Sequence, residues 1–324
     1  MAETVTPYPV AAKAKKGSVW FWILGGRKAL LAYALVPALL FYLVFWIYPL
    51  LQGFAGSLTN WSPMSIHTPE FLGLENYARA SSNRLVGIAI RNSLLFALFT
   101  VGVRTSLALA FAMTLNHLRR GQGLFRLIYF LPVVTSVVAA GYTWRFLYLP
   151  NGLFNAVLAM IRDGLGLSFD LPRYLQDPNL ALICIAVMSV WRWLGFEIVI
   201  FMAGLSGIPG EYYEAARIDG AGRWQLFRRI TLPLLQPTIL FILVTGLASE
   251  IQVFTEAFVM VSRGSGTPLG GPANSTLTIV MEFYQSAFRK FEFGYASAIA
   301  VIIFVIISVF SLAQLWIGRR RWEY

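Results

Sequence analysis

The sequence predicts an all-α integral membrane protein with six transmembrane helices. Hydrophobic residues make up 57% of the 324 residues and charged residues only 13%, whereas a soluble domain carries about 25% charged residues. Crossing a hydrocarbon core of about 30 Å takes about 20 apolar helical residues. Six runs are long enough, at roughly 29–52, 93–115, 124–148, 180–206, 238–261 and 295–317.

Basic residues gather in alternate connections between these runs. The N-terminus, the 116–123 turn, the 207–237 segment and the C-terminus hold about fifteen basic and five acidic residues, against about eight and seven in the other loops. Because basic loops mark the cytoplasmic side, both termini are expected in the cytoplasm. This distribution explains the net charge of +11 without a nucleic-acid partner. The expected parts are a cytoplasmic arm (1–28), a transmembrane domain (29–318) and a tail (319–324).

Motifs for chemistry within the chain are missing from the sequence. The single cysteine, Cys184, rules out an intrachain disulfide, and His67 and His117 lack metal-ligand spacing. The sequence also lacks a phosphate-binding P-loop, a nucleophile motif and paired catalytic carboxylates. We therefore expect no catalytic residue and no metal site.

The segment 207–237 predicts two short helices joined by a sharp turn. Pro209 and Glu211 suit the first turn of a helix, and Gly220 permits a change of direction. Pro233 and Pro237 are expected to end the second helix before the fifth span. Such an element is either a knob that another protein grips or a surface loop that merely connects two spans.

Motifs in this segment resemble those of a known family. Glu214-Ala215-Ala216, Gly220 and Ile230-x-Leu232-Pro233 have the spacing of the EAA coupling loop in permeases of binding-protein-dependent ABC importers. Gly73-Leu74-Glu75-Asn76-Tyr77 and Phe293-Gly294-Tyr295-Ala296 are similar to the carbohydrate branch, and within it to the first, MalF-like permease of a pair. The overall pattern also resembles importers of alginate oligosaccharides.

This resemblance implies a transport subunit of the bacterial inner membrane rather than an enzyme. A second homologous permease would complete the path, a periplasmic binding protein would deliver the oligosaccharide, and an ATPase dimer would bind ATP and Mg. No cofactor is expected on this chain itself. The residues that the resemblance assigns to ATPase coupling are Glu214, Ala215, Ala216, Arg217, Asp219 and Gly220.

Apart from Arg126, which adjoins the 116–123 turn, six ionisable residues fall inside the predicted spans. Each costs about 2.5–3.5 kcal/mol at the bilayer centre, so they are expected to face protein or a water-filled path. They either pair with one another or line a substrate path together with tryptophans. A single tryptophan is more often a membrane-interface anchor or a helix-packing residue than a platform for a sugar. Three arginines would suit an acidic oligosaccharide. The candidate path residues are Arg104, Trp144, Arg145, Trp191, Arg192, Trp193, Glu197, Glu250, Gln252 and Glu256.

Two other classes of function compete with this interpretation. A secondary sugar transporter would use the intramembrane glutamates as ion carriers, but it would have no use for an ATPase-docking knob. A membrane scaffold or enzyme is less favoured, because the sequence offers no constellation of catalytic residues.

Overall fold

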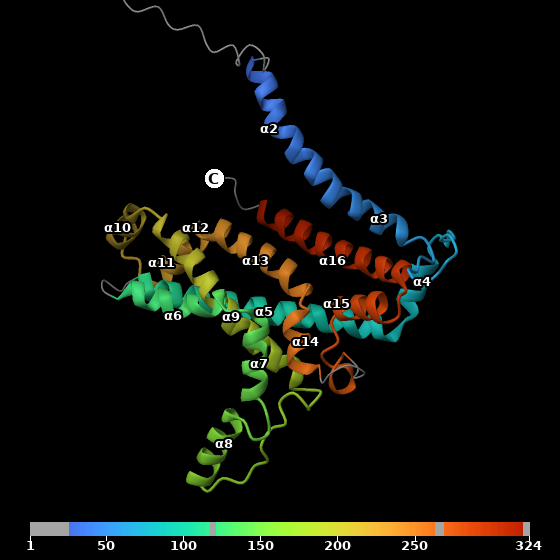
Figure 1. Ribbon diagram of the computed structural model, residues 1–324. Helices are drawn as coiled ribbons and strands as arrows, with labels where there is room; N and C mark the ends of the chain where they lie inside the picture. The colour runs from blue at the N-terminus through green and yellow to red at the C-terminus, as the bar shows by residue number, and fades with distance from the viewer. Residues whose placement is uncertain (1–25, 117–120, 263–268, 320–324) are drawn as a thin grey trace, which may run out of the picture. The chain divides into compact units, whose positions relative to one another are not determined.

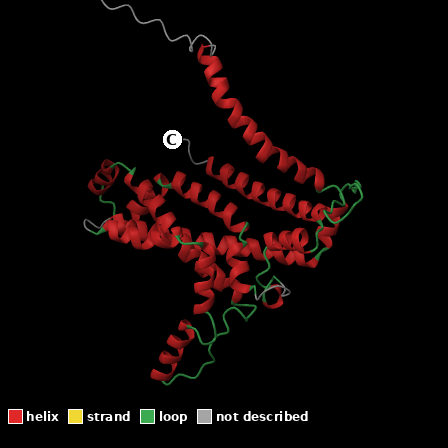
Figure 2. Cartoon of the chain, in the orientation of Figure 1, coloured by secondary structure: helices red, strands yellow, loops and turns green. Residues whose placement is uncertain are grey.

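A computed structural model describes residues 26–116, 121–262 and 269–319 (Figure 1). Helices form the regular structure, and these three ranges contain an isolated β-bridge between Thr59 and Phe71 but no strand (Figure 2). An all-α fold is thereby confirmed. The predicted arm 1–28 and tail 319–324 lie almost entirely outside the described residues.

The chain divides into two units, and the first ends at Gln52. It contains α2 (Gly26–Tyr42), the π-helical turn η1 (Leu43–Ile47) and most of α3 (Tyr48–Gly56). Large apolar side chains such as Leu39, Phe45 and Trp46 are exposed within this unit. A helix that is apolar on every side suits a lipid environment.

The second unit runs from Gly53 onward and contains the remaining helices. They are α4 (Glu75–Ser82), α5 (Arg84–Asn116), α6 (Gln122–Val134), α7 (Val137–Leu147), α8 (Leu153–Gly164), α9 (Ala181–Ser206), α10 (Gly210–Ile218), α11 (Arg223–Leu226), η2 (Phe227–Thr231), α12 (Leu232–Leu234), α13 (Gln236–Ile251), α14 (Thr255–Val261), η3 (Pro272–Asn274), α15 (Ile279–Tyr284), η4 (Gln285–Arg289) and α16 (Phe293–Arg319).

Four helices in the described ranges are long and apolar enough to cross a membrane unbroken. They are Leu35–Gly56, Arg84–Asn116, Ala181–Ser206 and Phe293–Gly318. Two further segments are bent pairs: Gly123–Val134 meets Val137–Leu147 at 96°, and Arg223–Leu234 meets Gln236–Ile251 at 62°. The predicted six spans are reached where each bent pair counts as one.

The second helix of the 207–237 segment ends at Leu234, between Pro233 and Pro237, and the next helix begins at Gln236. The two meet at a bend of 62°. Pro233 is the second residue of α12, which continues from the π-helical turn η2. A proline inside a helix removes one backbone hydrogen bond, and prolines and π-helical turns are common sites of bends.

Within the second unit, α5 packs along α9 and also contacts α13, while α16 packs against α13. Figure 1 shows α10 at one end of this bundle and α4 and α15 at the other. Arg79 of α4 binds Glu292 at 2.8 Å and so ties that end together. The segments at the α10 end are those that the charge distribution assigns to one side of the membrane.

At the α4 end, α15 contains a buried acid. The side chain of Glu282 is fully buried, and its nearest cation is Lys290, with Nζ 3.9 Å from Oε1. Burial raises the pKa of this carboxyl above its ordinary value, and Lys290 opposes the shift.

The contact between α6 and α9 depends on a glycine. A Cβ atom at Gly195 would overlap the carbonyl oxygen of Tyr129. Small residues allow two helix backbones to approach closely, which is a common packing device in membranes.

We expect Gly195→Ala to push α6 away from α9 and to lower the free energy of unfolding, because overpacking costs about 1–3 kcal/mol. Gly102→Ala in α5 is the matched control, since a Cβ there meets no described atom within 4 Å. Helix propensity should leave that control equally stable, or more stable by up to about 1 kcal/mol. Thermal unfolding in detergent measures both; equal melting temperatures would contradict the close contact.

Candidate functional site

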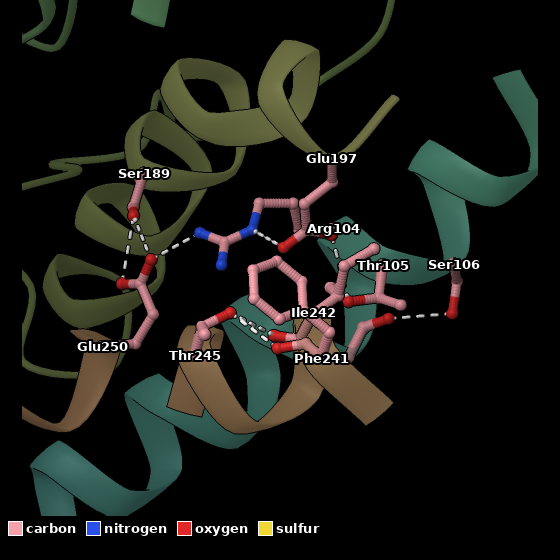
Figure 3. A network of polar contacts seen from close by, with 10 residues as sticks. Arg104, Thr105, Ser106, Ser189, Glu197, Phe241, Ile242, Thr245 and Glu250 are labelled. Atoms are coloured by element: carbon pink, nitrogen blue, oxygen red, sulfur yellow. Dashed lines mark hydrogen bonds and ion pairs between the residues drawn. The ribbon is translucent and has the colours of Figure 1, made fainter. Parts of the chain in front are cut away.

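A buried ion cluster joins three helices of the second unit (Figure 3). Arg104 of α5 donates from Nε to Glu197 of α9 at 2.6 Å and from Nη1 to Glu250 of α13 at 2.5 Å. Arg104 and Glu197 are each 4% exposed and Glu250 is 5% exposed. A charged group buried to this extent without an ion-pair partner would destabilise the protein. The cluster therefore fixes α5, α9 and α13 relative to one another.

Two hydroxyl groups complete the hydrogen bonding of the carboxylates. Ser189 Oγ donates to both oxygens of Glu250, at 3.2 and 3.1 Å, and Thr105 Oγ1 donates to Glu197 Oε2 at 3.1 Å (Figure 3). Neither residue was among the sequence candidates. The available signal is position, because Thr105 follows Arg104 directly and Ser189 lies one helical turn before Arg192.

A second ion pair connects α9 to the start of α14. Arg192 Nη1 lies 3.4 Å from Glu256 Oε1, and both side chains are 13% exposed. The guanidinium also lies over the ring of Trp193, 4.8 Å from its centroid. The buried Nε of Arg192 has no hydrogen-bond partner among the described residues. This pair is longer and more exposed than the Arg104 cluster.

Two adjoining pockets are lined by these charged groups. One, of about 250 Å³, has Arg104, Glu197 and Glu250 in its wall. The other, of about 150 Å³, is lined by Gln252 and Glu256 among others. Trp193, Ser249 and Glu250 line both. Because they share these three residues the pockets adjoin, and we call the pair the polar hollow after the charged groups in its wall; most of the wall of the larger pocket is apolar.

The second pocket lies at a break between two helices. α13 ends at Ile251 and α14 begins at Thr255, and Phe254 between them has φ −137° and ψ −61°. Non-helical backbone at membrane depth is tolerated where it is buried in protein or lines a cavity. The predicted span 238–261 is thus two helices, with polar side chains at the junction.

Three other candidates lie in a different environment. Arg145 donates from Nη1 to the backbone carbonyl oxygens of Ser262 at 2.8 Å and Val259 at 3.4 Å. Trp144 packs against Trp191 with 5.5 Å between ring centroids, and it also contacts Tyr148. The structure thus places six of the ten candidates in the walls of the two pockets, and Arg192 beside them through its pair with Glu256. Trp144, Arg145 and Trp191 line neither of these pockets.

The predicted coupling residues form an exposed elbow at one end of the bundle. Glu214, Ala215, Ala216 and Arg217 lie on α10, where every residue is exposed or half-buried, and Asp219 and Gly220 form the turn that follows. Gly220 has φ +79°, a left-handed conformation that favours glycine.

The elbow is held by hydrogen bonds to the next helix. Tyr213 Oη and Thr231 Oγ1 share a hydrogen bond of 3.0 Å, and the Gly222 N–H donates to Gln225 Oε1 at 2.9 Å. The first of these bonds links α10 to η2. The elbow is therefore tied to the helical segment that precedes α13.

The fold and these sites define a helical membrane protein with an internal polar hollow and an exposed elbow at one end. The chain belongs to the family of binding-protein-dependent transport system inner membrane components, which it matches over residues 106–323.

Three characterised relatives resemble nearly the whole chain. It is 33% identical over 287 residues to the lactose transport system permease protein LacF of Rhizobium radiobacter, covering 88% of this chain and 92% of that protein. It is 31% identical to the arabinooligosaccharides transport system permease protein AraP of Bacillus subtilis (97% and 96%). It is 33% identical to the trehalose/maltose transport system permease protein MalF of Thermococcus litoralis (91% and 96%).

The fold also matches solved structures. A chain of a bacterial ABC transporter involved in the import of the acidic polysaccharide alginate superposes with a TM-score of 0.75 at 23% identity, covering 91% of this chain and 96% of that one. A second structure of a bacterial alginate ABC transporter, in complex with a pentasaccharide-bound periplasmic protein, gives 0.76 at 22% identity, covering 94% and 98%. At these identities the likeness establishes the fold.

Arg104→Gln should destabilise the protein by about 3–5 kcal/mol, because it leaves two buried carboxylates without a counter-charge. Arg192→Gln is the control. It should lower the free energy of unfolding by less, since the ion pair of Arg192 with Glu256 is longer and more exposed. Unfolding in detergent measures both losses. Adding Glu197→Gln and Glu250→Gln to Arg104→Gln should recover part of the stability; equal losses in the two single variants and no recovery would contradict the role of the cluster.

Proposed function

We propose that this chain is the transmembrane permease subunit of an ATP-driven oligosaccharide importer. The proposal depends chiefly on one observation: an exposed elbow with the family's coupling motif is hydrogen-bonded to the helix that leads to the polar hollow. Family membership and relatives named for lactose, arabinooligosaccharide and trehalose/maltose transport support it. In this proposal a second permease completes the path and a periplasmic binding protein delivers the sugar.

The elbow would dock on an ATPase dimer that binds ATP and Mg, while this chain binds no cofactor. Both termini and α10 would lie in the cytoplasm, consistent with the basic excess of their segments. Movement of α10 would reach η2 through the Tyr213–Thr231 hydrogen bond and then α13 across the bend at Leu235. Because Glu250 lies on α13, that movement would change the shape of the hollow.

The substrate would bind through its hydroxyl groups and ring faces. Glu250, Gln252 and Ser249 offer hydrogen-bonding groups, and Trp193 offers an aromatic wall. The acidic, alginate-like oligosaccharide expected from the sequence requires arginines that are free to bind carboxylates. Arg104 instead binds two carboxylates and Arg192 one, while Arg145 binds two backbone carbonyl oxygens away from the hollow. The Arg104 cluster and the Arg192–Glu256 pair together carry one formal negative charge, which favours a neutral oligosaccharide.

A charge reversal in the elbow tests the coupling. Glu214→Lys should weaken ATPase docking by about 2 kcal/mol or more, which is roughly thirtyfold, if Glu214 pairs with a basic residue of the ATPase. Gly220→Ala should also reduce sugar-dependent ATP hydrolysis, because alanine at positive φ costs about 1–2 kcal/mol.

Gly222→Ala is the matched control for the glycine change, since Gly222 has φ −74°. Reconstituted assemblies in liposomes provide the measurement, with ATP supplied inside or omitted. Normal transport by both elbow variants would contradict the docking role. Uptake driven by an ion gradient without ATP would instead support a secondary transporter.

The preferred charge of the substrate is tested by comparing a neutral and an acidic sugar. A neutral oligosaccharide should stimulate ATP hydrolysis by the complete assembly more than a uronate oligosaccharide of equal length, and Glu256→Gln should shift the preference toward the acidic sugar by freeing Arg192. Glu75→Gln, an exposed acid at the start of α4, is the control. A wild-type preference for the acidic sugar would refute neutral specificity while leaving the permease function intact.

A further inference from the structure

The helix between the elbow and α13 is not aligned with the membrane-spanning helix that follows it. Arg223–Leu234, comprising α11, η2 and α12, bends by 62° from Gln236–Ile251. Leu235 at the bend is fully buried, so the junction is anchored in the bundle. Figure 1 shows α11 and α12 near α10, at the end of the bundle where the elbow lies.

One face of this helix is held against its own chain. Thr231 is 5% exposed and hydrogen-bonds to Tyr213. Phe227 and Ile230 are half-buried. These contacts fix which side chains point away from the protein.

The opposite face combines positive charge with exposed apolar groups. Arg228 and Arg229 are exposed and form no ion pair within the described part of the chain. Trp224 is 68% exposed and packs on Phe227 with 5.4 Å between ring centroids. Leu232 on the same helix is 37% exposed.

This combination has the chemistry of a membrane surface. A guanidinium binds phosphate oxygens through two parallel hydrogen bonds. Tryptophan prefers the interface between hydrocarbon and water, and basic residues next to a span attract anionic lipids. We propose that the outer face of Arg223–Leu234 binds the phosphate headgroups of anionic phospholipids, with Arg228 and Arg229 as the phosphate ligands and Trp224 as the interfacial anchor.

Two features of this face favour a lipid over a protein as its partner: its positive charge and its position next to the span that contains α13. The segment that carries this face ends one residue before the buried bend at Leu235 that leads into α13, so it lies at the end of a candidate span. An ATPase groove would cover α10, whose acidic residues Glu211 and Glu214 differ in charge from this face. The lipid site does not depend on the substrate or the energy source of transport.

Lipid titration of the purified full-length chain in detergent, followed by native mass spectrometry, tests the proposal. The wild type should bind phosphatidylglycerol more tightly than phosphatidylcholine. Each arginine near a membrane surface contributes about fivefold in affinity, so Arg228→Gln/Arg229→Gln should weaken phosphatidylglycerol binding by roughly 25-fold. Phosphatidylcholine binding should not change.

Two further variants distinguish a specific lipid site at Arg228 and Arg229 from an effect of the overall positive charge. Arg228→Lys/Arg229→Lys should keep most of the preference for the anionic lipid. Arg162→Gln/Arg173→Gln removes the same charge from the loop around α8 and should bind phosphatidylglycerol as the wild type does. Should the glutamine pair fail to fold, Arg228→Gln alone should show a loss of about fivefold.

Three results would overturn the proposal. The first is a wild type that does not distinguish the two lipids, and the second is equal loss in the outer-loop control. The third is unchanged lipid binding by the glutamine pair with weakened binding of the ATPase, which would assign this face to the protein partner.

Discussion

A guanidinium in the hydrocarbon interior must be surrounded by counter-charge and hydrogen-bond acceptors, because neither lipid nor bulk water can compensate it there. Arg104 meets this requirement through carboxylates on two other helices, and those carboxylates are in turn completed by Ser189 and Thr105. Three helices are thereby locked together at one point. One carboxylate remains in excess, and the cluster lines a pocket. The same interaction therefore sets the helix packing and the formal charge in the wall of this pocket.

The helix α13 connects this cluster to the surface of the molecule. It carries Glu250 near its end, and beyond it the break at residues 252–254 opens the second pocket. At its start it continues, through the bend at Leu235, into the helix that is hydrogen-bonded to α10. The elbow and the hollow are therefore connected by two helical segments that meet at this bend. The coupling role proposed for the elbow requires such a connection, whereas a secondary transporter would not need it.

The membrane class and the elbow can be predicted from the sequence. The first follows from composition, and the second depends on the spacing of residues close together in the chain around Gly220. The sequence identifies the ionisable residues but not their partners, since Arg104 lies 93 and 146 residues from the two carboxylates that bind it. Tertiary packing alone decides those pairings. The 96° bend between α6 and α7 was also not predicted, although Pro132 lies inside α6; a proline removes one backbone hydrogen bond and permits a kink without fixing its angle.

The basic residues divide into two physically different sets, and this division explains how a chain of net charge +11 can hold a negatively charged hollow. Inside the bundle, Arg104 and Arg192 face carboxylates, because an unpaired charge there would be too costly. At the end of the bundle, Arg228 and Arg229 can remain without acidic partners in the described chain because water and phosphate are available to them. The positive excess therefore lies outside the Arg104 cluster, in residues that the bundle does not neutralise. The charge inside the bundle follows from the partner of each buried arginine, and the total charge of the chain does not determine it.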